Sequence, residues 1–245
     1  AMEDKIKEIL LNLTHVNYEE SFIKERNVRS ISVQKDKVEI SIELNFPIVL
    51  LENEFKALIA NEIETLIKIP VKIYLTQKIK SHQAQKGISL IKGVKNVIAV
   101  ASGKGGVGKS STAVNLALAL MNEGSRVGIL DADIYGPSQP QMLGINQKPE
   151  SKDGKSMEPL IAHGLQVMSV GFLVDQETPM IWRGPMVTNT LEQLLKETNW
   201  DNLDYLVIDL PPGTGDIHLT LAQKIPVTGN LSSGGSNPLT GISGL

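Results

Sequence analysis

The sequence of 245 residues contains no cysteine, and aromatic side chains make up only 4% of it. Without cysteine the chain cannot form a disulfide, use a thiolate nucleophile or supply thiolate ligands to zinc or to an iron–sulfur cluster. The four histidines are scattered without the spacing of a metal site: His15, His82, His163 and His218. These absences exclude a disulfide-stapled secreted scaffold and a thiolate enzyme.

Long apolar stretches and a strong excess of one charge are also missing. No apolar run approaches the ~18 residues of a membrane span, and the first residues lack the basic and apolar regions of a secretory signal. Residues 1–96 carry 15 basic and 13 acidic side chains, and residues 97–245 carry 9 and 14. Neither half is basic enough to indicate binding to nucleic acid or to a membrane surface. The 41% of hydrophobic residues is typical of a globular chain. Because a membrane span and a secretory signal are both missing, we expect a cytoplasmic protein.

The first part of the chain, residues 1–78, has the pattern of a small α+β domain. Apolar residues at helical or alternating spacing predict, in order, a helix around residues 6–13, strands at 28–33 and 38–44, a helix at 55–66 that Pro70 ends, and a strand at 71–75. Residues 79–95 follow as a basic linker, since Lys78–Lys95 holds five lysines and no acid. A solvated linker is one interpretation of these lysines, and a basic surface for an acidic partner is the other.

In residues 96–228 the pattern of apolar residues changes and predicts strands that alternate with helices. Short apolar runs predict buried strands at 97–101, 127–130, 165–170 and 205–208, and helices are predicted at 110–123 and 185–197. This alternation indicates an α/β fold with a mostly parallel, doubly wound sheet. Residues 229–245 contain five glycines and four serines without an apolar run. We expect no strand or helix there, and interpret the segment as a flexible, non-native tail.

A phosphate-binding loop lies between the first of these strands and the helix that follows it. Its sequence fits G-x-x-x-x-G-K-[ST], with Gly103, Lys104, Gly105, Gly106, Val107, Gly108, Lys109 and Ser110 in order. Glycines allow successive N–H groups to surround a phosphate, and the helix N-terminus favours the same anion. We expect Lys109 to reach the β- and γ-phosphates of ATP and the Ser110 hydroxyl to bind Mg²⁺, with Ser111 or Thr112 at the α-phosphate.

Three acidic residues follow buried strands and are expected near this loop. Asp131 and Asp133 come after the strand at 127–130, and Asp209 ends the strand at 205–208. Ligands of parallel sheets bind at the carboxyl edge, where all three residues would lie. One carboxylate of the first pair is expected to hold a water of Mg²⁺ and the other to orient the attacking water, while Asp209 organises the metal. The alternative for a single aspartate at a strand end is a helix cap.

Together these stretches resemble the bacterial Mrp/ApbC family of P-loop ATPases that carry iron–sulfur clusters. The resemblance runs from about residue 93 to residue 229 and includes GVKNVIAVASGKGGVGKSSTAVNLALAL, VGILDADIYGPS, the HGL segment at His163, WRGPM at Trp182–Met186 and DYLVIDLPPGTGDIHLTLAQKIPVTG. Residues 1–78 resemble, by pattern, the small iron–sulfur assembly domain of the longer members. The resemblance implies that apo iron–sulfur proteins and assembly factors are partners of the protein.

The resemblance also implies a MinD-like deviant P-loop and a role for each site residue. In this loop type, Lys104 acts across a homodimer on the partner's nucleotide; an ordinary solvent-facing lysine is the alternative. Asp133 would position the water, and Asp131 and Asp209 would organise the metal. Lys109 and Ser110 keep the phosphate and Mg²⁺ roles given above.

The chain departs from the family after residue 229. Family members continue into a further strand, a pocket for the nucleotide base and a C-x-x-C pair that bridges a 4Fe–4S cluster between two subunits. We therefore expect a C-terminally truncated member with an unpaired sheet edge, in which the cluster ligands belong to the full-length family only. Two other functions remain open: a non-catalytic nucleotide-binding scaffold for iron–sulfur assembly, and a MinD/ParA-type positioning ATPase. The latter needs a membrane-binding helix or a basic DNA surface, and neither is visible in the sequence.

Overall fold

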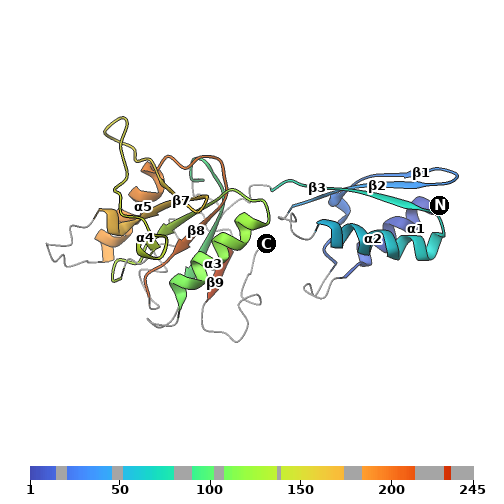
Figure 1. Ribbon diagram of the computed structural model, residues 1–245, viewed down its shortest axis with the longest axis horizontal. Coiled ribbons are helices and arrows are strands. Elements are labelled where there is room, and N and C mark those ends of the chain that lie inside the picture. Colours follow the sequence, from blue (N-terminus) through green and yellow to red (C-terminus); the bar gives the residue numbers. More distant parts are fainter. Residues whose placement is uncertain are drawn as a thin grey trace. The chain divides into compact units, whose positions relative to one another are not determined.

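The computed structural model describes two compact units, Ala1–Lys80 and Ser81–Leu245 (Figure 1). Within them, the described residues are 1–14, 21–45, 52–79, 90–101, 108–136, 139–173, 184–212 and 229–232. No helix in these ranges combines the length and the apolar character needed to cross a bilayer.

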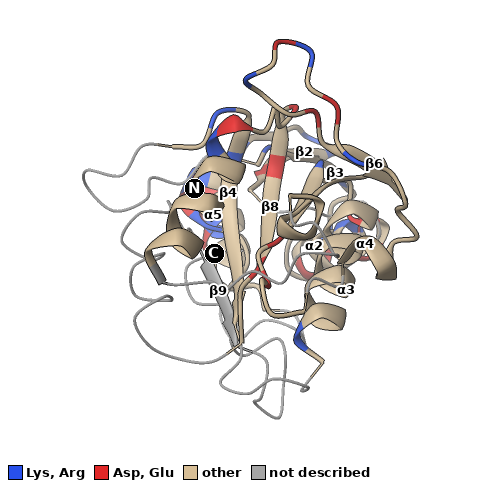
Figure 2. Cartoon of the chain, turned by 90° about the vertical axis from the view of Figure 1, so that its left-hand side faces the viewer, with Lys and Arg blue, Asp and Glu red and all other residues tan. Residues whose placement is uncertain are grey.

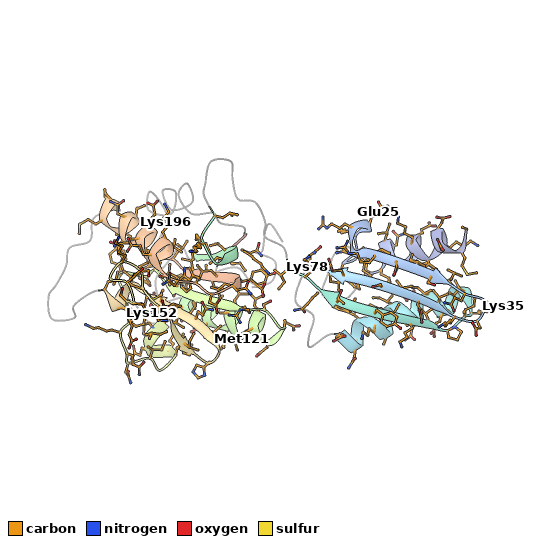
Figure 3. The ribbon with its side chains drawn as sticks, turned by 90° about the horizontal axis from the view of Figure 1, so that it is seen from above. Glu25, Lys35, Lys78, Met121, Lys152 and Lys196 are labelled. Atoms are coloured by element: carbon orange, nitrogen blue, oxygen red, sulfur yellow. The ribbon has the colours of Figure 1, made fainter. Side chains whose placement is uncertain are left out.

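The first unit is a three-stranded sheet with two helices. Its elements are α1 (Met2–Asn12), the 3₁₀ turn η1 (Glu25–Asn27), β1 (Val28–Val33), β2 (Val38–Leu44), α2 (Glu52–Ile67) and β3 (Val71–Gln77). The strand order is β1-β2-β3, with β1 antiparallel and β3 parallel to β2. Figure 3 labels Glu25 of η1 and Lys35, which lies in the turn between β1 and β2.

Both helices bury one apolar stripe against the same core. In α2 the buried side chains are Phe55, Ile59 and Ile63, spaced four residues apart, and in α1 they are Ile6 and Leu10. They join every second residue of the central strand β2, whose side chains alternate between buried and half-buried. This arrangement follows from the two periodicities, because residues four apart share a helix face and alternate residues share a sheet face.

The second unit is a six-stranded sheet flanked by helices. Its elements are β4 (Val94–Ala101), α3 (Lys109–Asn122), β5 (Val127–Asp131), α4 (Gln139–Met142), β6 (Leu160–Ala162), β7 (Leu165–Ser169), the 3₁₀ turn η2 (Val170–Phe172), α5 (Gly184–Glu197), β8 (Leu203–Asp209) and β9 (Gly229–Ser232). The strand order is β6-β7-β5-β8-β4-β9. The edge strand β6 is antiparallel to β7, and the other pairs are parallel. The expected mostly parallel sheet is therefore present.

The central strands β4 and β8 run side by side and are drawn mostly in the colour of uncharged residues in Figure 2. Nearly all of their side chains are buried, as expected for strands of a parallel sheet that is covered on both faces.

Helix α3 has defined ends that fix its position at the sheet. At its N-terminus, Gly108 adopts a positive φ of 78° as the N-cap. At its C-terminus, Gly124 has a φ of 95°, and the N–H groups of Gly124 and Ser125 donate to the carbonyls of Met121 and Leu120. This is the Schellman pattern, which ends a helix with a glycine in the left-handed conformation.

We expected no strand in residues 229–245, and this expectation is wrong for residues 229–232. Strand β9 pairs in parallel with β4, from Ile98 opposite Gly229 to Ala101 opposite Ser232. Pairing uses backbone N–H and C=O groups, which glycine and serine supply as well as apolar residues do, so the missing apolar run did not exclude a strand. Strand β4 is therefore paired on both sides, with β8 and with β9. The short elements α4 and β6 were not predicted either.

Candidate active site

The carboxyl ends of the parallel strands bring three polar side chains into line. Asp131 at the end of β5 lies opposite Ser169 of β7 on one side and opposite Asp209 of β8 on the other. All three side chains are fully buried. Because α3 begins directly after the loop that follows β4, its first residues face the same edge.

Lys109, the first residue of α3, is buried among acidic groups. Its ammonium donates to Asp209 Oδ1 and lies 3.7 Å from Asp133 Oδ2. The Ser110 hydroxyl donates to the second oxygen of Asp209 at 2.7 Å. Buried charges require pairing, so Lys109 compensates Asp209 and Asp133 together.

Asp131 is held by hydrogen bonds from the protein on both of its oxygens. Oδ1 accepts from the N–H of Asp133 at 3.1 Å, and Oδ2 accepts from the N–H of Gln139 at 3.0 Å and from the Ser169 hydroxyl at 3.3 Å. Burial raises the pKa of Asp131 to about 6, and the nearby Asp209 carboxylate adds to the rise. Through these hydrogen bonds, Asp131 links the end of β5 to the end of β7 and to the first residue of α4.

Asp133 presents one oxygen to the protein and the other toward Lys109. Oδ1 accepts from the N–H groups of Tyr135 and Gly136 at 3.1 and 3.2 Å. Burial raises the pKa of the Asp133 carboxyl, while the positive charge of Lys109 acts in the opposite direction. The backbone bonds fix the direction of the carboxylate without using Oδ2.

Gln139, which our sequence reasoning missed, lies at the centre of this network. Its side-chain Nε2 donates to Asp209 Oδ2 at 3.0 Å and to the Ser110 carbonyl at 2.9 Å. The side chain is fully buried. Ser169 was missed as well, although it lies within the strand predicted at 165–170 and ends β7 at the same sheet edge as Asp131 and Asp209. Nothing in the local sequence pattern indicates Gln139.

The oxygen atoms of the site suit a small, hard cation that also binds oxygen atoms of a ligand. Ser110 Oγ and the Asp209 carboxylate are oxygen donors of the kind that Mg²⁺ takes. Within the described ranges, no group of three or more histidine, aspartate or glutamate residues is arranged to hold a metal ion by itself. Mg²⁺ fits this sparse set, since it commonly binds one or two protein groups and completes its shell with phosphate oxygens and water.

Of the residues expected at the site, the structure brings together Lys109, Ser110, Asp131, Asp133 and Asp209. Ser111 is exposed on the first turn of α3, and the Thr112 hydroxyl donates to the carbonyl of the N-cap residue at 3.0 Å. The loop residues Gly103, Lys104, Gly105, Gly106 and Val107 lie outside the described residues.

A family model matches residues 93–233, more than half of the chain, and describes the family as ParA, NUBPL iron-transfer P-loop NTPase. The chain belongs to this family. The match confirms both the resemblance to Mrp/ApbC proteins and the P-loop NTPase fold, and the chain is accordingly a nucleotide-binding P-loop protein by family.

Several relatives of the NTPase are called iron–sulfur cluster carrier proteins. One from Haemophilus influenzae is 46% identical over 230 residues, which are 93% of this chain and 62% of that protein. One from Escherichia coli K12 is 68% identical over 140 residues, 57% of this chain and 38% of that protein. One from Rickettsia felis is 42% identical over 91% of this chain and 70% of that protein. The chain thus spans less than two thirds of the length of the first two.

A solved structure of a nucleotide-binding protein from Archaeoglobus fulgidus in complex with ADP is also similar to this NTPase. It is 38% identical, with a TM-score of 0.51, and the match covers 58% of this chain and 55% of that one. Sequence and fold therefore both assign the second unit to the P-loop NTPases.

Proposed function

We propose that the chain binds ATP with Mg²⁺ and hydrolyses it to ADP and phosphate, as the nucleotide-hydrolysing part of an iron–sulfur cluster carrier that delivers clusters to apo-proteins. The observation that supports this most directly is the meeting of Lys109, Ser110, Asp133 and Asp209 at one point of the sheet edge. The names of the relatives favour the carrier over a positioning ATPase.

Phosphate binding falls to the glycine-rich loop and to the start of α3. The first turn of α3 contains no acidic residue, so its positive end is available to an anion. Lys109 pairs with Asp209 and Asp133 in the structure. Lys109 exchanges these carboxylates for phosphate oxygens when a nucleotide binds, which keeps its buried charge paired in both states.

Ser110 and Asp209 would hold Mg²⁺, which when bound neutralises charge on the phosphate oxygens. Asp209 loses the contact with Lys109 when that lysine moves to the phosphates, and a cation at Asp209 restores the balance of charge. Asp131 supports this arrangement from a distance, because its two oxygens already accept hydrogen bonds from the protein.

In this proposal, Asp133 orients the attacking water. Its Oδ1 is held by two N–H groups, which leaves Oδ2 to accept a hydrogen bond from water once Lys109 has turned to the phosphates. Lys104 would act from the second subunit of a homodimer on the same phosphates, where an added cation stabilises the transferring group.

The cluster is the cargo in this proposal, and the residues present do not fit its ligation. The chain has no cysteine, and thiolates are the usual ligands of iron–sulfur clusters. Cluster binding would therefore use groups outside these 245 residues, and no step of the hydrolysis depends on it.

The decisive experiment compares nucleotide binding and turnover in matched lysine variants. Calorimetry with Mg-ATP should show binding for the parent chain and for Lys152→Met, an exposed control, and loss of binding for Lys109→Met. Phosphate release by the parent, with release abolished but binding retained in Asp133→Asn, would support hydrolysis. Equal affinity in Lys109→Met and the parent would place the nucleotide elsewhere, and binding without any turnover would make the chain a non-catalytic scaffold.

A further inference from the structure

Gln139 joins three separate parts of the sheet edge through one residue. Its backbone N–H donates to Asp131 Oδ2 at 3.0 Å, and its side-chain Nε2 donates to Asp209 and to the Ser110 carbonyl. Asp131 belongs to β5, Asp209 to β8, and Ser110 to the first turn of α3. The residue therefore links every group that we expect to organise Mg²⁺.

The orientation of the amide is determined by its neighbours. An amide nitrogen carries two hydrogens, and both are used, one toward Asp209 Oδ2 and one toward the Ser110 carbonyl. Turning the amide over would place Oε1 against these two acceptors, which is repulsive. Oε1 must then point away from Asp209 Oδ2 and the Ser110 carbonyl.

Gln139 Oε1 is left as a buried acceptor. It has no hydrogen-bond partner among the described residues, although its residue is fully buried. A buried acceptor without a donor is unfavourable, and such groups in folded proteins commonly bind water or a ligand. The same amide donates to Asp209, the carboxylate proposed to bind Mg²⁺. A water molecule bound to that metal would lie near the amide and would supply the donor that Oε1 lacks.

We propose that Gln139 is a positioning residue of the Mg²⁺ site: Nε2 holds Asp209 beside Ser110, and Oε1 accepts a hydrogen bond from a water molecule bound to the metal. This inference rests on the proposed function, since it needs a metal–nucleotide complex. Residues that orient metal ligands in this way contribute strongly to metal affinity without touching the metal. The specific consequence is that Gln139 strengthens nucleotide binding only when Mg²⁺ is present.

The test measures the Kd of ADP by calorimetry twice for each variant, once with Mg²⁺ and once with EDTA. Gln139→Met keeps the length of the side chain but removes both its donors and its acceptor. Gln141→Met is the matched control, because Gln141 is exposed on the same short helix. We expect the gain in affinity from Mg²⁺ to fall by about 10-fold or more in Gln139→Met and to be unchanged in Gln141→Met.

A purely structural role would weaken ADP binding equally in both buffers, so an unchanged ratio of the two Kd values in Gln139→Met would overturn the proposal. If Gln139→Met fails to fold by circular dichroism, Gln139→Asn replaces it. Asparagine is shorter by one methylene and withdraws the same amide from Asp209, so the same loss of the Mg²⁺ effect is expected. A parent chain that binds no ADP in either buffer would overturn the proposed function as well, whereas a normal parent with an unaffected Gln139 variant overturns only this inference.

Discussion

At the scale of single residues, Asp131 shows how the sheet edge changes the chemistry of a carboxyl group. Burial raises its pKa to about 6, while the N–H groups of Gln139 and Asp133 oppose the rise. Asp209 and Asp133 lie close enough to repel its negative charge. The folded chain therefore binds the proton of Asp131 more tightly than the unfolded chain does.

This difference predicts a pH dependence of stability for the metal-free protein. The contribution of Asp131 to folding is present below its unfolded pKa of about 3.9 and is lost as the pH rises through about 6. Asp131→Asn does not titrate, so between pH 4 and pH 7 its free energy of unfolding should gain about 2 kcal/mol relative to the parent. Urea unfolding in EDTA at each pH measures the difference.

Asp153 is the matched control for Asp131→Asn. The N–H groups of Ser156 and Lys155 lower the pKa of this exposed carboxyl to about 2, so its contribution is present above about 3.9 and disappears only as the pH falls toward 2. Asp153→Asn should therefore keep a constant difference from the parent between pH 4 and pH 7. Parallel curves for the two variants would show that burial does not raise the pKa of Asp131.

At the scale of elements, the junction before β4 depends on a glycine. Gly93 has a φ of 79°, and a Cβ at this position would lie 2.0 Å from the Trp200 carbonyl oxygen. The Gly93 carbonyl also accepts from the N–H of Leu203 at 2.7 Å, where β8 begins. The start of β4 and the start of β8 are therefore held together by a contact that no other residue type permits.

Gly93→Ala should lower the free energy of unfolding by at least about 3 kcal/mol, because it adds a backbone collision to the cost of a left-handed φ. Gly154→Ala separates the two effects, since Gly154 has a φ of 72° but open space around its Cβ position. This control should lose only about 1–2 kcal/mol. Chemical denaturation measures both, and equal losses would mean that the Trp200 carbonyl moves aside freely.

A similar close contact exists at the C-terminal end of α3, between Gly164 and Met121. A Cβ at Gly164 would lie 2.8 Å from the sulfur of Met121, the side chain that Figure 3 labels on this helix. Here the neighbour is the flexible part of a side chain rather than backbone, so the contact constrains the sequence less than the one at Gly93.

At the scale of the whole molecule, the division into Ala1–Lys80 and Ser81–Leu245 predicts that a nucleotide stabilises only one unit. Calorimetric unfolding of the full chain should show two transitions. Mg-ADP at 100 times its Kd should stabilise the second unit by about 2.7 kcal/mol and leave the transition of the first unit in place. Lys109→Met should remove the effect, and a joint shift of both transitions would show that the units unfold together.

A second prediction at this scale concerns Lys104 and the homodimer. If Lys104 acts on the partner's nucleotide, Lys104→Ala should bind ATP as a single subunit but lose turnover and ATP-dependent dimerisation. The fall in turnover is expected at or below the lower end of the ~10³–10⁵ range of arginine fingers, because lysine is a point charge rather than a two-pronged donor.

Mixing two inactive variants shows whether Lys104 acts on the neighbouring subunit. In a heterodimer of Lys104→Ala with Asp133→Ala, the first subunit keeps its own Asp133 and receives an intact lysine from the second. Phosphate release should then recover in part. Heterodimers shown by light scattering or pull-down to form, yet as inactive as either parent variant, would restrict Lys104 to its own loop.

The sequence by itself determined the fold class and named most of the described residues that meet at the candidate site, because these depend on local patterns. The strands at 28–33 and 38–44 have the predicted bounds, since alternation between apolar and polar residues is visible within one strand. Lys109, Ser110 and Asp209 could be named from a motif and from the rule that strand ends meet at one edge. Only the tertiary structure revealed β9, whose pairing depends on backbone groups. The same is true of Gln139, which contacts Asp209 across 70 residues of sequence. A contact of that separation leaves no periodicity in the chain, and it exists only because α3, β8 and the segment after β5 converge in three dimensions.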